Sequence, residues 1–287
     1  MISVISAHNA LSARRWRRWS VLTLSLALAT APTLFSAAAQ TVQSAQSAWN
    51  IEMDAASGIE WSRNVATGEG SYRASGGVRV ARGDATVRAD TIVAFYRRGA
   101  SSGQDVYRFE ASGTVCLERG GAVACGQHGV YDLAEGMFVL TGAGLRLESP
   151  DLVVTATEAL EFWDRTRIAI ARGDAKAVRG DRTLSADQLT AFFAPSADAT
   201  TGGALLRVEG AGHVVLTSPN QVARGDEGAY DAAQESATLC GAVRITRGPD
   251  QLEGACALLD LRTGRSVLTG GARGVRGLLT PRQKQGS

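Results

Sequence analysis

The 287-residue chain contains few of the residues that common catalytic and metal sites require. It has three histidines and four cysteines, without a Cys-x-x-Cys pair, a His-Glu-x-x-His motif or a Gly-x-Ser-x-Gly motif. These absences argue against a zinc site, a zinc protease and a serine hydrolase. We therefore expect no catalytic residue, no metal site and no cofactor.

Lysine is almost absent, and arginine supplies the positive charge. Lys176 and Lys284 are the only lysines in a chain with 30 basic and 28 acidic residues. Residues 1–39 contain four arginines and no acidic residue, so the rest of the chain has 26 basic and 28 acidic residues. Nucleic-acid-binding domains usually carry a clear basic excess. We therefore expect no nucleic-acid partner.

Long apolar runs are missing after the first forty residues. Residues 14–18 are basic apart from one tryptophan, residues 21–31 are mostly apolar, and three alanines precede Gln40. This order is typical of a secretory signal peptide. We predict a cleavable signal peptide over residues 1–39, with cleavage after Ala39. The alternative is an uncleaved anchor helix, for which the apolar segment is short.

From Trp49 onward, alternating apolar and polar residues indicate β-strands, as in Val243-Arg-Ile245. No segment has a convincing helical pattern; the best candidate, 155–162, is flanked by residues that favour a strand. Glycines precede such strands at intervals of 29 to 37 residues. They are Gly76, Gly113, Gly142, Gly173, Gly210, Gly241 and Gly270.

The sequence also repeats with a longer period. Tyr131-Asp132 recurs 99 residues later as Tyr230-Asp231, and other pairs recur at 97 or 99 residues. This repeat indicates a tandem duplication. Because a single hairpin cannot bury its apolar face alone, stacked hairpins predict an elongated all-β sandwich, jelly roll or solenoid. The predicted divisions are a first half over 40–172, a second half over 173–277 continuous with the first, and a polar tail over 278–287.

Cysteine spacing predicts two disulfides within hairpins. A two-residue turn at 120–121 and a three-residue turn at 247–249 each place two cysteines opposite one another. Opposed strand residues have Cα separations of about 4.5–5.5 Å, which suit a disulfide. The alternative is four buried free thiols. The predicted pairs are Cys116–Cys125 and Cys240–Cys256.

The segment 74–96 resembles the core hairpin of the LptA/OstA family of periplasmic lipopolysaccharide-transport proteins. It contains Ala74-Ser-Gly-Gly-Val-Arg-Val-Ala-Arg-Gly83 and then Val87-Arg-Ala-Asp90. The resemblance covers residues 49–178 and is repeated more loosely afterwards. The asparagine that follows the strand-opening glycine in the family is replaced here. Further matching segments are 49–54, 128–134, 138–142, 145–147 and the polar tail at 280–286, and the replaced asparagines correspond to Gly77, Thr114 and Ala143.

The resemblance implies an open β-jelly roll, in which two sheets face one another across an apolar groove. It also implies a periplasmic protein without enzymatic activity, which binds the acyl chains of lipopolysaccharide (lipid A) and bridges the inner and outer membranes. The implied partners are an LptC-like inner-membrane protein, an LptD-like outer-membrane protein and further copies of the chain, joined head to tail.

The predicted groove residues come from two arguments. Four match family positions that line the groove, and six follow from alternation alone. The first four are Trp49, Ile51, Val115 and Tyr131; the other six are Val78, Val80, Phe138, Leu140, Leu145 and Leu147.

Other functions compete with this interpretation. Within the same class, the chain could be LptC-like or a detached LptD N-terminal module, and an uncleaved leader would favour the LptC-like form. In a different class, a β-solenoid carbohydrate-active enzyme would need acidic residues clustered on one face. A structural or adhesive exported protein is the third alternative.

Overall fold

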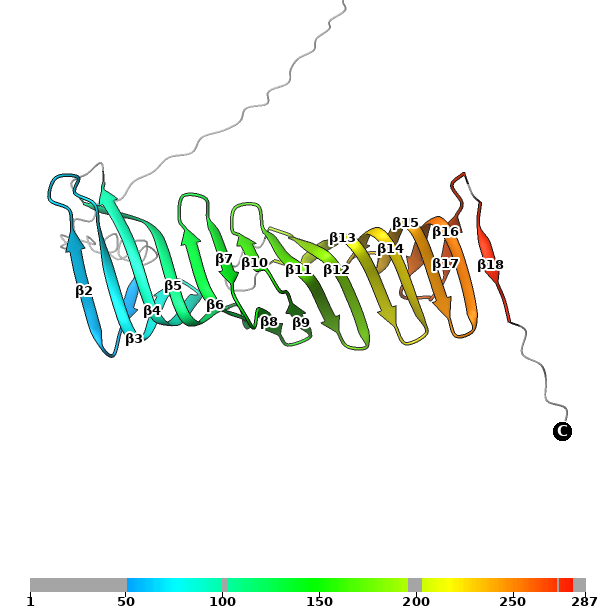
Figure 1. Cartoon of the computed structure of the whole chain (residues 1–287), viewed down its shortest axis with the longest axis horizontal. Coiled ribbons are helices and arrows are strands. Elements are labelled where there is room, and N and C mark those ends of the chain that lie inside the picture. The colour runs from blue at the N-terminus through cyan, green and yellow to red at the C-terminus, as the bar shows by residue number, and fades with distance from the viewer. Residues whose placement is uncertain (1–50, 100–102, 196–202, 273, 281–287) are drawn as a thin grey trace, which may run out of the picture. The chain divides into compact units, whose positions relative to one another are not determined.

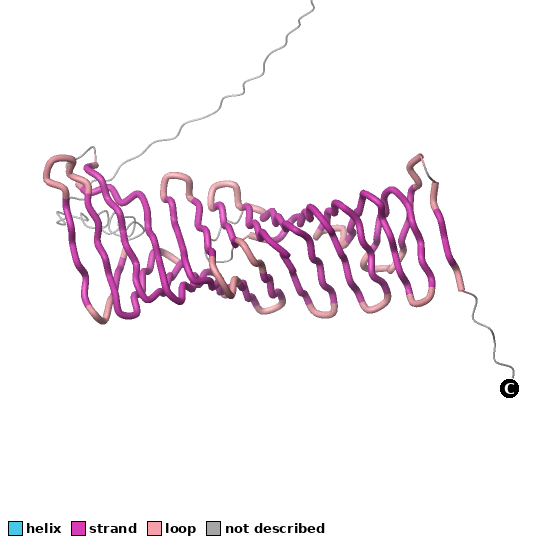
Figure 2. Tube along the Cα trace, in the orientation of Figure 1, coloured by secondary structure: helices cyan, strands magenta, loops and turns pink. Residues whose placement is uncertain are grey.

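The computed structural model describes residues 51–99, 103–195, 203–272 and 274–280, all within the compact unit Ser44–Ser287. The predicted signal peptide and Trp49 lie outside the described residues. Every regular element that is described is a β-strand (Figure 2). The all-β prediction is therefore confirmed, and the segment around 155–162 belongs to strands rather than to a helix.

In the described residues, eighteen strands form one antiparallel sheet, in which the long strands β3 to β6 and β11 to β16 pair in chain order (Figure 1). β7 pairs with β6 and β10, and β17 and β18 both pair with β16. The bounds of the strands are β1 Glu52–Asp54, β2 Gly58–Arg63, β3 Gly70–Arg82, β4 Ala85–Arg98, β5 Gln104–Arg119, β6 Ala122–Asp132, β7 Met137–Thr141, β8 Arg146–Ser149, β9 Leu152–Thr155, β10 Ala159–Trp163, β11 Ile168–Arg179, β12 Arg182–Phe193, β13 Leu205–Ser218, β14 Gln221–Asp231, β15 Ser236–Arg247, β16 Asp250–Asp260, β17 Ser266–Thr269 and β18 Arg276–Leu278.

The long strands are interrupted by bulges, which divide the sheet into two ladders. In β3, residues 70–75 pair with β2, whereas residues 79–81 pair with β1. The register shift lies between Ser75 and Val78. Equivalent shifts occur in other long strands, for example between Ser112 and Val115 of β5. A bulge bends a strand, so each long strand contributes one part to each ladder.

We call these the first and the second ladder. The first contains β2, β7, β10, β17 and the parts of the long strands that align with them. The second contains β1, β8, β9, β18 and the remaining parts of the long strands. Apolar residues from both ladders form one hydrophobic cluster, which places the core between them. This arrangement is the jelly roll that the resemblance implies.

The ladders run without interruption past the predicted division at residue 172. That division falls inside β11, at the register shift between Arg172 and Ala175. The part of β11 before the shift pairs with β10, and the part after it pairs with β9. Both parts also pair with β12. The two-half organisation remains a prediction about sequence repetition, because hydrogen bonding does not mark it.

Candidate functional site

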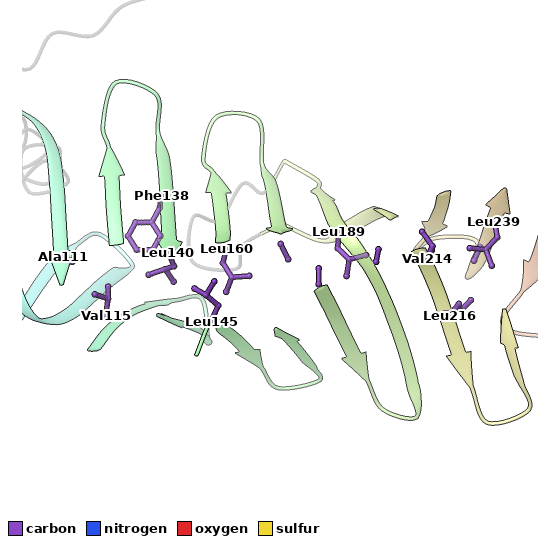
Figure 3. Close-up of a cluster of buried hydrophobic side chains, with 14 of the residues drawn as sticks. Ala111, Val115, Phe138, Leu140, Leu145, Leu160, Leu189, Val214, Leu216 and Leu239 are labelled. Atoms are coloured by element: carbon purple, nitrogen blue, oxygen red, sulfur yellow. The ribbon is translucent and has the colours of Figure 1, made fainter. Parts of the chain in front are cut away.

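The interior between the ladders contains nine of the predicted groove residues. Figure 3 shows four of them, Val115, Phe138, Leu140 and Leu145. Successive residues of a strand point to opposite faces, so alternate apolar residues reach the interior. Val115, from the second-ladder part of β5, is fully buried, and Leu140 of β7, in the first ladder, is 1% exposed. The fully or nearly fully buried members of the predicted set are Val78, Val80, Val115, Phe138, Leu140 and Leu145.

Three further predicted residues border this core. Ile51, Tyr131 and Leu147 are partly buried and pack against the same cluster. Tyr131 and Phe138 pair across β6 and β7, with ring centroids 6.4 Å apart. The nine predicted residues that the structure describes therefore meet in one interior.

The cluster continues through the second half of the chain, where no groove residue was predicted. The alternation in Val243-Arg-Ile245 was visible in the sequence and gave the signal for these positions, but the family motifs are weaker there. In the first half, Ile92 and Leu160 were also missed. Second-half members of the cluster include Leu189, Val214, Leu216, Leu239, Val243, Ile245 and Leu259.

The interior is filled by the chain's own side chains. Surface hollows of about 490 and 370 Å³ lie elsewhere, and none of the predicted groove residues lines them. The core side chains are 0–9% exposed, so the interior is closed to solvent in this conformation. A ligand can therefore enter only if the ladders separate or the interior side chains move.

Polar side chains close the opening between the ladders in the first half. Arg119, at the end of the second-ladder part of β5, donates to Asp164 in the turn after β10, at 2.7 Å. It also donates to Asp84, in the turn between β3 and β4, at 3.1 Å. The Tyr131 hydroxyl donates to the other oxygen of Asp164 at 3.1 Å. Arg119 also lies over the ring of Phe162, 5.6 Å from its centroid.

Burial and the neighbouring charges shift the pKa values of Arg119 and Tyr131. Partial burial lowers the pKa of the Arg119 guanidinium, but hydrogen bonds and charge attraction to Asp164 and Asp84 outweigh that effect and raise it. Burial, followed by the negative charge of Asp164, raises the pKa of the Tyr131 hydroxyl. Arg119 therefore stays charged and Tyr131 stays a hydrogen-bond donor over the neutral range.

The opening is bridged differently in the second half. Arg182 of β12 donates to the carbonyl oxygen of Leu261 at 3.1 Å, and Arg247 of β15 donates to that of Gly264 at 3.1 Å. Arg247 also donates to the Gln221 amide oxygen at 2.8 Å, and this oxygen accepts from Ser266 at 3.4 Å. The acceptors in these contacts are neutral.

The two ends of the sheet are exposed. β2 pairs with β3, and β18 pairs with β16; neither has a second strand partner among the residues that the structure describes. Trp61 of β2 is 56% exposed, and its indole donates to the Tyr96 hydroxyl at 2.5 Å. Leu278 of β18 is 65% exposed. Backbone groups and apolar side chains are therefore available at both ends.

Both predicted disulfides are confirmed, but the three-residue turn predicted at 247–249 is wrong. Arg247 pairs directly with Asp250, and the bulge between Cys240 and Val243 provides the shift that brings Cys240 opposite Cys256. Each disulfide joins residues that face one another across a hairpin, with Cα separations of 4.2 and 4.1 Å. Their neighbours in sequence, such as Val115 and Leu239, point into the core, so the disulfides lie on the outer faces of the ladders. The pairs are Cys116–Cys125 and Cys240–Cys256.

The described ranges contain no group of three or more histidine, cysteine or acidic residues that could hold a metal ion. Nor does any helix in these ranges have the length and apolar character needed to cross a membrane.

Comparison with known proteins identifies the family. The family model described as "LptA/(LptD N-terminal domain) LPS transport protein" matches residues 63–159 and, a second time, residues 153–265. The chain belongs to this family. Its members are transport proteins, and the chain has a role in lipopolysaccharide transport. The two matches together span the interior from β3 to β16.

Individual relatives are more distant. An uncharacterized protein of Rhizobium meliloti (strain 1021) is 30% identical over 128 residues, which are 44% of this chain and 69% of that protein. The crystal structure of LptH from Pseudomonas aeruginosa is described as the LptA homologous periplasmic component of the conserved lipopolysaccharide transport device. It aligns with 17% identity and a TM-score of 0.38, over 45% of this chain and 95% of LptH. The strand pairing and the family match establish the fold, and the alignment with LptH does not contribute to it.

Proposed function

We propose that the chain binds lipopolysaccharide in the interior between its two ladders and shields the acyl chains of lipid A during export to the outer membrane. The observation that carries this proposal is the single apolar cluster, which continues through both segments that match the transport family. Each CH₂ group removed from water contributes about 0.8 kcal/mol, so an interior of this kind favours acyl chains over the aqueous phase.

The proposed lining consists of the predicted groove residues, with the second-half cluster as its continuation. Aliphatic and aromatic side chains dominate it, and its polar contacts lie at the opening. Acyl chains that displace Val115 or Leu140 from their contacts with other side chains would replace one apolar surface with another. The exchange therefore leaves no buried polar group without a partner.

We further propose that the exposed ends dock other proteins of the transport system. An unpaired edge strand presents backbone donors and acceptors that another strand can extend. β2 and β18 are such edges, and they carry exposed apolar residues such as Trp61 and Leu278. The proposed partners are an LptC-like inner-membrane protein at one end and an LptD-like outer-membrane protein at the other. Head-to-tail contact with a second copy would use the same two edges.

The proposed location is the periplasm, reached through the cleavable signal peptide predicted over residues 1–39. The two disulfides support an oxidising compartment. Mass spectrometry of the protein isolated from the periplasmic fraction would test this location, with a mature N-terminus at Gln40 as the expected result.

Calorimetry with two ligands tests the binding function. The folded mature chain is titrated with purified lipopolysaccharide and, separately, with its polysaccharide after lipid A has been removed. We expect binding of the intact molecule with a negative heat-capacity change, because apolar surface is buried, and no binding of the polysaccharide alone. Binding of the polysaccharide alone would contradict the proposal and favour a carbohydrate-directed function.

A further inference from the structure

Arginine recurs at the rim of the second ladder. Each of these arginines comes two residues after an apolar residue of the core, such as Val80 or Leu117, and directly before a turn glycine with φ between 56° and 59°. Because alternate residues share a face, these arginines occupy interior-facing positions where the opening begins. They are Arg82, Arg119, Arg179 and Arg247.

Arg119 crosses the opening to a carboxylate on the opposite ladder. Its ion pair with Asp164 links strand β5 to the turn after β10, two positions 45 residues apart in sequence. The Asp164 side chain is 34% exposed and that of Arg119 is 33% exposed, so water and solutes reach both groups. Val115, on the same face of β5, is fully buried behind this contact.

The acceptors distinguish this contact from the bridges in the second half. Arg182 and Arg247 are held there by the neutral oxygen atoms of Leu261, Gly264 and Gln221. Arg119 is held by two carboxylates, one through Nε and one through a terminal nitrogen. A phosphate group offers anionic oxygen atoms that a guanidinium binds equally well. An arriving phosphate can therefore replace Asp164 at Arg119 without leaving the arginine unpaired.

We propose that Arg119 and Asp164 form a latch across the side opening, which the phosphate of an amphiphilic glycolipid releases. The inference rests on the proposed function and deepens it, because it identifies the headgroup that gains entry. The phosphate binds Arg119, Asp164 is freed, the two ladders separate at this point, and the acyl chains enter beside Val115. A lipid with the same acyl chains and no phosphate enters only when the contact between Arg119 and Asp164 breaks spontaneously.

Association rates measured by stopped-flow fluorescence test the latch in the folded mature chain. The two probes are bis-phosphorylated lipid A and the same lipid after removal of its phosphates. We expect the phosphorylated form to associate with the unmodified chain at least fivefold faster. Arg119→Gln should make the two rates equal, whereas Asp164→Asn should raise the rate for the dephosphorylated form at least threefold, because the latch is then weakened.

Arg88→Gln is the matched control. It removes the ion pair between Arg88 and Glu118, which are 59% and 50% exposed and lie within the second ladder, so both rates should stay as in the unmodified chain. Arg119→Lys keeps the charge and should keep part of the phosphate preference, which separates the latch from a loss of folding. Inorganic phosphate at high concentration should raise the slow rate of the dephosphorylated lipid in the unmodified chain, because a free anion also displaces Asp164 from Arg119. It should not raise that rate in Arg119→Gln.

Several results would overturn the latch. Equal rates for the two lipids with the unmodified chain would do so, as would a phosphate preference in Arg119→Gln as large as in Arg88→Gln. An acceleration by inorganic phosphate that persists in Arg119→Gln would show that the anion acts elsewhere, and it would overturn the latch as well. In all three cases lipid still binds, so the proposed function stands; failure of both lipids to bind would instead reject that function and the latch with it.

Discussion

Glycines at the bulges show how single residues allow the strands to change ladder. Gly113 of β5 has a φ of 99°, and a Cβ atom placed there would lie 2.1 Å from Oδ2 of Asp90. Gly241 meets Asp226 in the same way, at 2.3 Å. Only glycine tolerates both the positive φ and the close approach. These glycines therefore allow the bends within strands.

The bulge glycine gives the first prediction. Gly113→Ala should lower the free energy of unfolding by about 2–4 kcal/mol, because it combines backbone strain with the contact to Asp90. Gly77→Ala is the control, since Gly77 has a φ of 76° and open space around its Cβ position. That variant should lose only about 1–2 kcal/mol through strain. Urea unfolding measures both; equal losses would show that the close approach to Asp90 has no effect.

A second residue-scale prediction concerns His213, beside the bulge of β13. Its Nδ1 lies 2.9 Å from Oδ2 of Asp187, and this hydrogen bond, followed by charge attraction, raises the pKa of His213 above 6.5. A raised pKa in the folded state stabilises the protein below the unfolded value of about 6.5, and that contribution is lost as the pH rises through the folded pKa. A proton NMR titration should show the raised value, and Asp187→Asn should lower it. An unchanged His213 pKa in that variant would contradict the assignment.

At the scale of elements, the disulfides join neighbouring strands next to the bulges. Cys240 is the last paired residue of β15 before its register shift, and its partner Cys256 lies opposite on β16. Cys116 lies one residue beyond the end of the shift in β5, opposite Cys125 of β6. Each disulfide therefore holds two strands in register close to where their hydrogen-bond ladder is interrupted.

Removing each disulfide gives the element-scale prediction. The bonded residues are 16 apart in Cys240–Cys256 and 9 apart in Cys116–Cys125. Loop-closure entropy predicts losses of about 3 kcal/mol for Cys240→Ser with Cys256→Ser and slightly less for Cys116→Ser with Cys125→Ser. Chemical unfolding of the two double variants measures these losses. A larger loss from the shorter loop would indicate that strand register, and not chain entropy, dominates.

The strands and the disulfides can be predicted from the sequence because each depends on residues that lie close together in the chain. Alternation identified the faces of the strands around Val78 and Val115, and the two-residue turn at 120–121 gave the pairing of Cys116 with Cys125. The pairing of Cys240 with Cys256 depends on the bulge in β15 and not on the three-residue turn that was predicted. The bulges could not be predicted from alternation, because a glycine between two apolar stretches fits a turn as well as a bend. The contact between Arg119 and Asp164 depends on how two ladders close over one another, and no local pattern specifies it.

For the whole molecule, the important feature is one interior shared by two repeats of a family domain. The core extends from Val78 of β3 to Leu259 of β16 without a break at β11. The family model matches residues 63–159 and, a second time, residues 153–265. The residues shared by the two matches lie before β11 begins. A single chain therefore provides the apolar length of two consecutive units, and we expect acyl chains along both.

Photo-crosslinking tests the central claim, that lipid occupies this interior. A photoreactive phenylalanine analogue replaces Tyr131, which packs against the core, or Val123, which is 37% exposed and outward-facing on the same strand, β6. After illumination with lipopolysaccharide, the account predicts a lipid adduct at position 131 and none at position 123. Adducts of equal yield at both positions, or no adduct at either in the folded protein, would contradict it.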